Sequence, residues 1–183
     1  IIYIQDCIDE MAEIANPKYI YKIYDINHAI NFISIVETNI ILKGNSIKKH
    51  LEDSTKCSLL GATLGINVDK RIEYYKSYDL TRSIVLDACG TAFIEKVCDD
   101  IEEKIRKEAK EKYDLNITSR FSPGYGDLSL NIQPNLLNIL DANKIGLTVT
   151  EQLIMIPRKS VTAIIGFMEK ENKLTKGCKY CLK

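Results

Sequence analysis

Six adjacent residues combine the side-chain types best suited to binding a small polar ligand: Arg120-Phe121-Ser122-Pro123-Gly124-Tyr125. Arg120 carries a planar guanidinium whose N–H donors match a carboxylate, and this group stays charged at any physiological pH. The Pro-Gly pair favours a tight turn, and glycine lets a ligand approach the backbone closely. Tyr125 adds a flat apolar ring with a polar tip, which suits a heterocycle. A ligand that joins an amino acid to a heterocyclic base would need these parts.

The same loop also fits a purely structural interpretation. Turns rich in proline and glycine are common at protein surfaces, and Arg120 could simply pair with a nearby acidic side chain. Residue types alone therefore leave a binding loop and a surface turn as open alternatives.

Length and composition indicate a single globular domain with its own hydrophobic core over residues 1–183. The 25 basic and 25 acidic residues balance and are well mixed, which argues against a nucleic-acid partner. No apolar run approaches the ~20 residues needed to cross a membrane, and no signal peptide opens the chain. We therefore expect a cytoplasmic protein without a membrane partner. Because the chain opens with Ile1-Ile2 and not with Met, we also expect a few N-terminal residues to be missing.

Hydrophobic spacing predicts helices and strands in an irregular order. A first helix has apolar residues three or four positions apart and ends at Asn16-Pro17, and Ser46 is a candidate N-cap for a short second helix. The apolar residues of the first helix are Ile4, Ile8, Met11 and Ile14. Helices are predicted over residues 1–15, 46–51, 67–78, 80–113 and 128–140, and strands over 19–26, 32–42, 57–64, 145–156 and 160–167. Without regular βαβ alternation, this order predicts an α+β fold with a mostly antiparallel, twisted sheet and helices packed on it.

The long helix over residues 80–113 has an apolar stripe and a charged second half. Pairs such as Glu102–Arg106 and Glu103–Lys107 are four residues apart, so the charged run over residues 99–112 is typical of a solvated helix face. The stripe consists of Ile84, Ala88, Ile94, Val97, Ile101 and Ile105.

The usual catalytic signatures are absent from the sequence, and we predict no catalytic residue. There is no Gly-rich phosphate loop, no paired-histidine zinc helix and no Gly-x-Ser-x-Gly elbow. His28 and His50 are the two histidines, and Cys89 lacks an activating base at a recognisable spacing. Four cysteines are expected to be reduced and buried in the core. They are Cys7, Cys57, Cys89 and Cys98.

The tail over residues 169–183 contains a second pair of candidate ligands, Cys178 and Cys181. This spacing can chelate zinc or an iron–sulfur cluster, but both sites need four ligands and only half a site is present. A redox dithiol and a tail with two inert thiols are the alternatives.

Several motifs taken together resemble the activation domain of cobalamin-dependent methionine synthase. Arg-x-x-Pro-Gly-Tyr at Arg120–Tyr125 is followed roughly twenty residues later by Ile145-Gly146-Leu147-Thr148-Val149-Thr150-Glu151, and then by Met155-Ile156-Pro157 ahead of Ser160-Val161. The chain resembles more closely the free-standing bacterial proteins that consist of this domain alone. Ser46-x-x-x-His50-Leu51, Ala62-Thr63-Leu64-Gly65 and the helix around residues 88–107 extend the resemblance over residues 19–167.

The resemblance implies a binding site for S-adenosylmethionine. Arg120 would hold the carboxylate region of the ligand, Gly124 and Tyr125 would surround the nucleoside, and Ser122 would offer main-chain hydrogen bonds. A gap-free alignment of the long helix places Glu95 at the ligand-contacting glutamate of the family. An ordinary exposed helix acid is the alternative interpretation of Glu95.

The resemblance also implies a function and partners. The chain would be an activation subunit and not a stand-alone enzyme: it would present S-adenosylmethionine to inactive cob(II)alamin held by a separate methionine synthase, with a flavodoxin-like electron donor. One alternative is an activator of another corrinoid methyltransferase system whose electron passes through a cluster at Cys178 and Cys181. Another is a non-catalytic interaction domain that has lost the ligand.

The sequence departs from the family pattern at three places. Gly126-Asp127-Leu128-Ser129 replaces the Cys-Pro-x-His stretch near the corrinoid, so direct cobalamin contacts are not carried over. A C-terminal pair of tyrosines has no counterpart in residues 169–176, and an N-terminal acidic ligand contact has no match.

Overall fold

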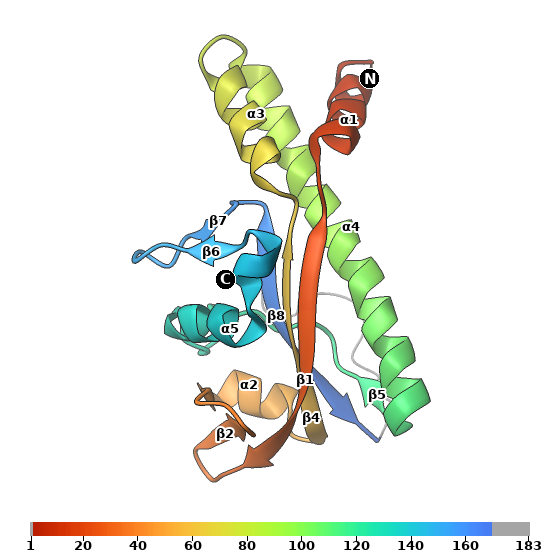
Figure 1. Cartoon of the computed structure of the whole chain (residues 1–183), viewed down its shortest axis with the longest axis vertical. Helices are drawn as coiled ribbons and strands as arrows, with labels where there is room; N and C mark the ends of the chain where they lie inside the picture. Colours follow the sequence, from red (N-terminus) through yellow and green to blue (C-terminus); the bar gives the residue numbers. More distant parts are fainter. Residues whose placement is uncertain (1, 170–183) are drawn as a thin grey trace.

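A six-stranded antiparallel sheet forms the centre of the molecule, and the computed structural model describes residues 2–169 of the chain (Figure 1). Its strand order is β3-β2-β1-β4-β8-β5, and every neighbouring pair is antiparallel. The strands are β1 (Lys18–His28), β2 (Phe32–Ile35), β3 (Ile41–Lys43), β4 (Ser54–Thr63), β5 (Asn116–Ile117) and β8 (Ser160–Met168). A separate small hairpin pairs β6 (Thr148–Val149) with β7 (Met155–Ile156).

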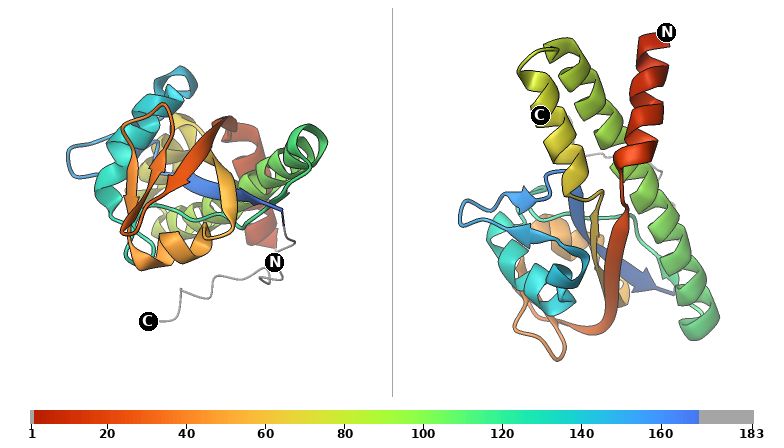
Figure 2. Two further views of the ribbon diagram at one scale, coloured as in Figure 1. Left: turned by 90° about the horizontal axis from the view of Figure 1, so that it is seen from below. Right: turned by 45° about the horizontal axis from the view of Figure 1, so that its top comes forward.

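Helices cover both faces of the sheet. On one face the long helix α4 (Leu80–Tyr113) packs together with α1 (Ile2–Ile14) and α3 (Ile66–Lys76), and the ends of these helices extend beyond the strands (Figures 1 and 2). The other face carries α2 (Asn45–His50), α5 (Gln133–Leu140) and two 3₁₀ segments, η1 (Leu130–Ile132) and η2 (Ala142–Ile145). The predicted α+β class, with an antiparallel sheet and packed helices, is confirmed.

The central strand β4 supplies side chains to both hydrophobic layers, because successive residues of a strand point to opposite faces. Leu60 belongs to the cluster that contains α4, whereas Leu59 belongs to the cluster that contains α5. Both side chains are fully buried, as expected of a strand with an almost continuous apolar run.

Three segments that the sequence predicted as single helices or strands are divided into shorter elements in the structure. Residues 32–42 form two short strands joined by a turn in which Glu37 has a positive φ of 62°. The predicted helix over 128–140 begins with a loop and η1, and Pro134 lies in the first turn of α5, where its missing N–H costs no hydrogen bond. Residues 145–156 hold only the end of η2 and the small β6–β7 hairpin.

The helix faces that pack against the core also differ from the predicted stripes. In α1 the buried residues are Cys7 and Met11, while Ile4 and Ile8 are about half exposed. In the first half of α4 the predicted Ile84 is 62% exposed and Ala88 is exposed as well. The residues buried in their place are Ser83, Leu86 and Gly90. Both helices carry apolar residues on more than one face, and the way the helices cross decided which face is buried.

The cysteines of the core match the prediction with one exception. Cys7, Cys57 and Cys98 are buried free thiols, whereas Cys89 is only partly buried against the α4 layer. Burial raises the pKa of the Cys57 and Cys98 thiols to about 12, so neither forms a reactive thiolate at physiological pH. Among the described residues, no helix is both long and apolar enough to cross a membrane.

Candidate functional site

The segment from Thr118 to Phe121 is held against strand β8 at both of its ends. The Thr118 N–H donates to the Gly166 carbonyl at 2.9 Å. Phe121 exchanges two hydrogen bonds with Ile164, at 2.9 and 2.8 Å. Arg120 lies between these anchors, so the path of its backbone is determined by the sheet.

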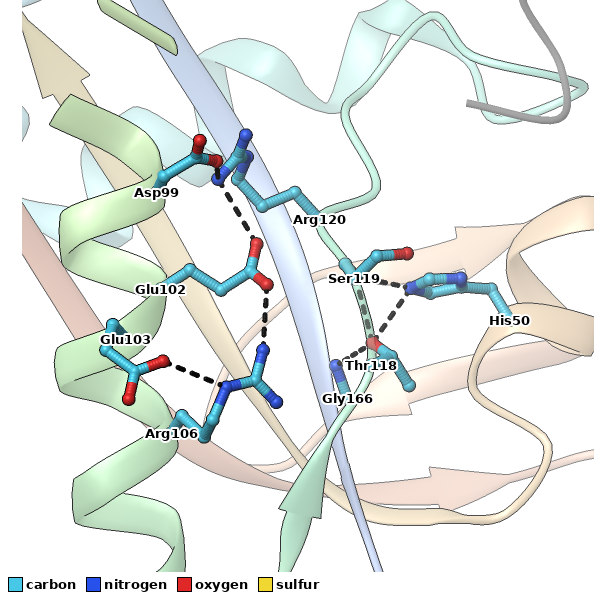
Figure 3. A network of polar contacts seen from close by, with 9 residues as sticks. All are labelled: His50, Asp99, Glu102, Glu103, Arg106, Thr118, Ser119, Arg120 and Gly166. Carbon is cyan, nitrogen blue, oxygen red and sulfur yellow. Dashed lines mark hydrogen bonds and ion pairs between the residues drawn. The ribbon is translucent and has the colours of Figure 1, made fainter. Parts of the chain in front are cut away.

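Arg120 extends toward α4 and meets three carboxylates there. Its Nη1 lies 2.9 Å from Asp99 and 3.2 Å from Glu102, and its Nη2 lies 3.1 Å from Glu95. Residues 95, 99 and 102 are four and three positions apart, so they occupy one face of the helix. Figure 3 shows Arg120 with Asp99 and Glu102, together with Arg106 on the following turn. Arg106 also contacts Glu102, at 3.1 Å, which confirms the predicted Glu102–Arg106 pair.

This cluster carries more negative than positive charge. Burial disfavours the Arg120 cation, but the hydrogen bond to Asp99 and the neighbouring carboxylates outweigh burial and raise its pKa. Arg120 and Glu102 are mostly buried, with 17% and 19% of their side chains exposed, whereas Glu95 and Asp99 are 57% and 65% exposed. Two of the three carboxylates around Arg120 are therefore open to a ligand from solvent.

The loop after Arg120 closes into a compact turn. The Tyr125 N–H donates to the Ser122 carbonyl at 3.1 Å, and the Gly124 N–H donates to the Leu128 carbonyl at 2.9 Å. Gly124 has a φ of +90°, a backbone conformation that side-chain-bearing residues rarely adopt. The turn leaves 46% of Tyr125 exposed.

Asp127 ties this turn to α2. Its carboxylate accepts hydrogen bonds from the backbone N–H groups of Asn45, at 2.6 Å, and Ser46, at 2.9 Å. These backbone hydrogen bonds lower the pKa of Asp127. The prediction that Ser46 caps this helix is wrong: the helix begins at Asn45, and a carboxylate from a distant loop satisfies its first N–H groups.

A family model for the vitamin B12-dependent methionine synthase activation domain matches residues 45–175. The chain belongs to this activation-domain family. The matched residues include α4 and the whole Arg120–Tyr125 loop, so the residues that carried the resemblance lie inside the match.

A solved structure shares the fold of this activation domain. The crystal structure of the MetH reactivation domain bound to AdoHcy matches with a TM-score of 0.72 at 14% sequence identity. The match covers 92% of this chain but 65% of the other, so this chain spans just under two thirds of its length. Among curated protein sequences, none matches this chain significantly.

The activation domain brings together residues that the sequence predicted separately. Glu95 and Arg120 are 25 positions apart and form an ion pair, while Ser122, Gly124 and Tyr125 share the turn that follows. The surface-turn alternative, in which Arg120 pairs with a nearby acid, correctly describes the pairing. The three ion pairs of Arg120 with α4 use Nη1 and Nη2, and its Nε–H takes part in none of these three. The contacts of these five residues with a ligand stay predictions.

Asp99 and Glu102 of the activation domain were not predicted as site residues. Their spacing from Glu95 along the helix was the available signal, but the charged run was interpreted as a solvated face. That interpretation is wrong for Glu102, which is mostly buried between Arg120 and Arg106. The expected Glu103–Lys107 pair is replaced by a contact of Glu103 with Arg106 at 3.3 Å.

Two hollows of the described surface lie away from this cluster. One, of about 570 Å³, lies between α1 and α3, and another, of about 270 Å³, lies beside Arg158. Both hollows are lined by acidic and basic side chains, and neither lining includes a residue of the Arg120 cluster. Within residues 2–169, no three His, Cys, Asp or Glu side chains are placed so that they could hold a metal ion together, and Cys178 and Cys181 lie outside these described residues.

Proposed function

We propose that the chain is an S-adenosylmethionine-binding reactivation module that supports reductive methylation of cobalamin in a separate methionine synthase. Membership in the activation-domain family supports this proposal. The related MetH domain was solved with AdoHcy, which is S-adenosylmethionine without its transferable methyl group. The observation that carries the proposal is the ion pair between Arg120 and Glu95, which is followed along the chain by the turn with the exposed Tyr125.

The charges of the cluster fit the charges of this ligand. S-adenosylmethionine carries a carboxylate, an ammonium and a sulfonium, so its net charge is positive. Arg120 would direct its remaining N–H donors at the carboxylate, and the exposed carboxylate of Glu95 would face the cationic groups. The surplus of acids over bases favours a ligand with net positive charge.

The turn would hold the other end of the ligand. The exposed ring of Tyr125 offers a flat face to the adenine, and Gly124 lets the nucleoside approach the main chain. Backbone groups of Ser122 lie at the start of the same turn. These residues bind and orient, and the chemistry needs no acid or base from this chain.

The remaining parts of the reaction would come from partners in the cytoplasm. Cobalamin held by the methionine synthase would take one electron from a flavodoxin-like donor and then the methyl group of S-adenosylmethionine, leaving AdoHcy. In this proposal the chain is an activation subunit and not a stand-alone enzyme.

Ligand-dependent stability tests the proposal. S-adenosylmethionine at about 100 times its dissociation constant should stabilise the protein by about 2.7 kcal/mol, which thermal unfolding detects as a higher melting temperature. Arg120→Ala should remove this shift. Arg158→Ala is the matched control, because Arg158 is exposed in the turn before β8 and lies outside the cluster. A melting temperature that millimolar ligand leaves unchanged in the unmodified protein contradicts the proposal.

A further inference from the structure

The backbone around Arg120 contains a β-bulge. Strand β5 pairs with β8 through Ile117 and Phe167, and Thr118 continues this register opposite Gly166. Phe121, however, pairs with Ile164, so Ser119 and Arg120 together stand opposite the single residue Ile165. Two residues against one define a bulge, which bends the strand and redirects a side chain. Here the redirected side chain is that of Arg120.

Because of the bulge, the Ser119 carbonyl takes no part in the backbone hydrogen bonds of the sheet. The side chain of His50 is a hydrogen-bond partner of this carbonyl instead. The His50 Nε2 lies 2.9 Å from the Ser119 oxygen and 2.9 Å from the Thr118 Oγ1 (Figure 3). The Thr118 hydroxyl donates to the same carbonyl at 3.0 Å and accepts the Gly166 N–H at 2.8 Å. A carbonyl oxygen only accepts, so the Nε2 atom of His50 carries the hydrogen.

The surroundings of His50 hold its ring in place. The ring lies 5.0 Å from the Phe121 ring, centroid to centroid, and Thr118 is only 2% exposed. Burial lowers the pKa of His50, which favours the neutral ring with a single N–H.

The two ends of helix α2 thus contact the residues before and after the Arg120–Tyr125 loop. His50, the last residue of α2, holds the backbone just before Arg120, and the first N–H groups of α2 bind Asp127, just after Tyr125. This short helix packs on the opposite face of the sheet from α4, so it can act on the cluster only through the loop.

We propose that His50 is a positioning residue for ligand binding: it holds the Ser119 carbonyl and thereby fixes the bulge that directs Arg120 toward the carboxylates of α4. This inference rests on the proposed binding of S-adenosylmethionine. His50 does not touch the ligand in this proposal. Its effect is confined to the part of the ligand that Arg120 holds.

His50→Phe is the informative variant, because it keeps a ring against Phe121 and removes the N–H donor. We expect it to weaken binding of S-adenosylmethionine about tenfold, as the loss of one hydrogen bond to the backbone implies. His50→Gln retains an N–H donor and should restore most of the affinity. His28→Phe is the matched control, since His28 Nε2 also contacts a backbone carbonyl, that of Ser54 at 2.7 Å, and His28 lies on β1, which β4 separates from β8.

Isothermal titration calorimetry of the full chain with S-adenosylmethionine measures these affinities, and urea unfolding of each variant measures stability. A second titration with 5′-methylthioadenosine, which shares the nucleoside but lacks the amino-acid part, separates positioning of Arg120 from general damage. The expected result is a loss for S-adenosylmethionine that is several-fold larger than the loss for 5′-methylthioadenosine.

Different outcomes identify which idea fails. If the unmodified protein does not bind S-adenosylmethionine, the proposed function fails, whatever the variants do. If it binds, and His50→Phe binds equally well or loses affinity equally for both compounds, the positioning role of His50 is wrong. If His50→Phe does not fold, the comparison of His50→Gln with the unmodified protein decides. A glutamine variant that folds normally but binds S-adenosylmethionine tenfold more weakly overturns the role of the N–H donor.

Discussion

At the scale of single residues, the main feature of the site is that several carboxylates bind the guanidinium of Arg120. Arg120 is mostly buried and is contacted by Glu95, Asp99 and Glu102, of which Glu102 is shared with Arg106. Glu102 orients the Arg120 fork from a mostly buried position, whereas Glu95 and Asp99 are exposed enough to exchange a contact with Arg120 for a contact with a ligand cation. A charge-assisted pair is stronger than a neutral hydrogen bond, so the charge of Glu95 should be measurable in ligand affinity.

Glu95→Gln keeps the shape of this side chain and removes its charge. We expect affinity for S-adenosylmethionine to fall about fivefold at low salt, because one charge-assisted contact contributes roughly 1 kcal/mol at an exposed position. The loss should shrink in 0.5 M salt, where charges are screened within a few ångströms. Glu103→Gln is the control, since Glu103 contacts Arg106 and has no contact with Arg120. Equal affinities for Glu95→Gln and the unmodified protein would remove Glu95 from the site.

At the scale of elements, the site depends on a short helix and a loop that stabilise one another. Helix α2 begins at Asn45 without a side-chain cap of its own, and Asp127 of the loop binds its first N–H groups. At the other end of α2, His50 holds the Ser119 carbonyl. Asp127 therefore has a structural task in this chain, because it stabilises the start of α2.

Asp127→Ala should lower the melting temperature, and Asp127→Asn should lower it less because asparagine can still accept one hydrogen bond. The folded state depresses the pKa of Asp127, so its contribution is fully present above the unfolded pKa of about 4 and is lost as pH falls through the lower folded value. The difference in melting temperature between Asp127→Ala and the unmodified protein should accordingly be constant from pH 5 to 7 and narrow below about pH 4. A difference that stays the same down to pH 2 would contradict this account.

Gly166 tests the packing of β8 against the segment that joins α2 to β4 and against the first residue of β4. A Cβ on Gly166 would lie 2.3 Å from the Ser54 Oγ and 2.7 Å from a Leu51 methyl group, so Gly166→Ala should destabilise the protein by about 1–3 kcal/mol. A Cβ on Gly61, on the neighbouring strand β4, would meet its nearest atom at 3.4 Å, and Gly61→Ala should cost clearly less. Urea denaturation of both variants measures the two free energies of unfolding, and equal values would show that the space around Gly166 adapts.

At the scale of the whole molecule, we expect stability to depend on contacts at the start of α4 and the proposed ligand binding to depend on contacts at its middle. Near the start of this helix, Glu10 of α1 accepts hydrogen bonds from Arg82 at 2.6 Å and from Tyr75 at 2.9 Å, and it lies 3.2 Å from Arg71. The Glu10 side chain is 12% exposed and joins α1, α3 and α4. The carboxylates that contact Arg120 begin at Glu95, about 20 Å further along α4 at 1.5 Å per residue.

Glu10→Gln should therefore lower stability without changing ligand affinity. Burial opposes the Glu10 charge, but the hydrogen bonds from Arg82 and Tyr75 prevail and lower its pKa, so the ionised form stabilises the fold at neutral pH. Loss of this charge should cost about 1–3 kcal/mol in chemical unfolding. Titration calorimetry with S-adenosylmethionine should give an unchanged dissociation constant. A parallel loss of affinity would show that the contacts of Glu10 and the Arg120 cluster are coupled.

Local patterns in the sequence determined the elements, and the tertiary structure decided which of their residues meet. The extent of α4, the buried strands β4 and β8 and the turn at Pro123-Gly124 were predictable, because helical and strand periodicity and the conformational limits of proline and glycine act over a few neighbouring residues. Neither the exposure of Ile84 nor the cap of α2 was predictable, since each depends on a partner far away in the chain. The same holds for the site itself. The resemblance to a known family predicted that Arg120 lies in a binding loop. The extra residue between Thr118 and Phe121 directs the Arg120 side chain toward Asp99 and Glu102. This register is set only when β8 pairs with the segment after α4.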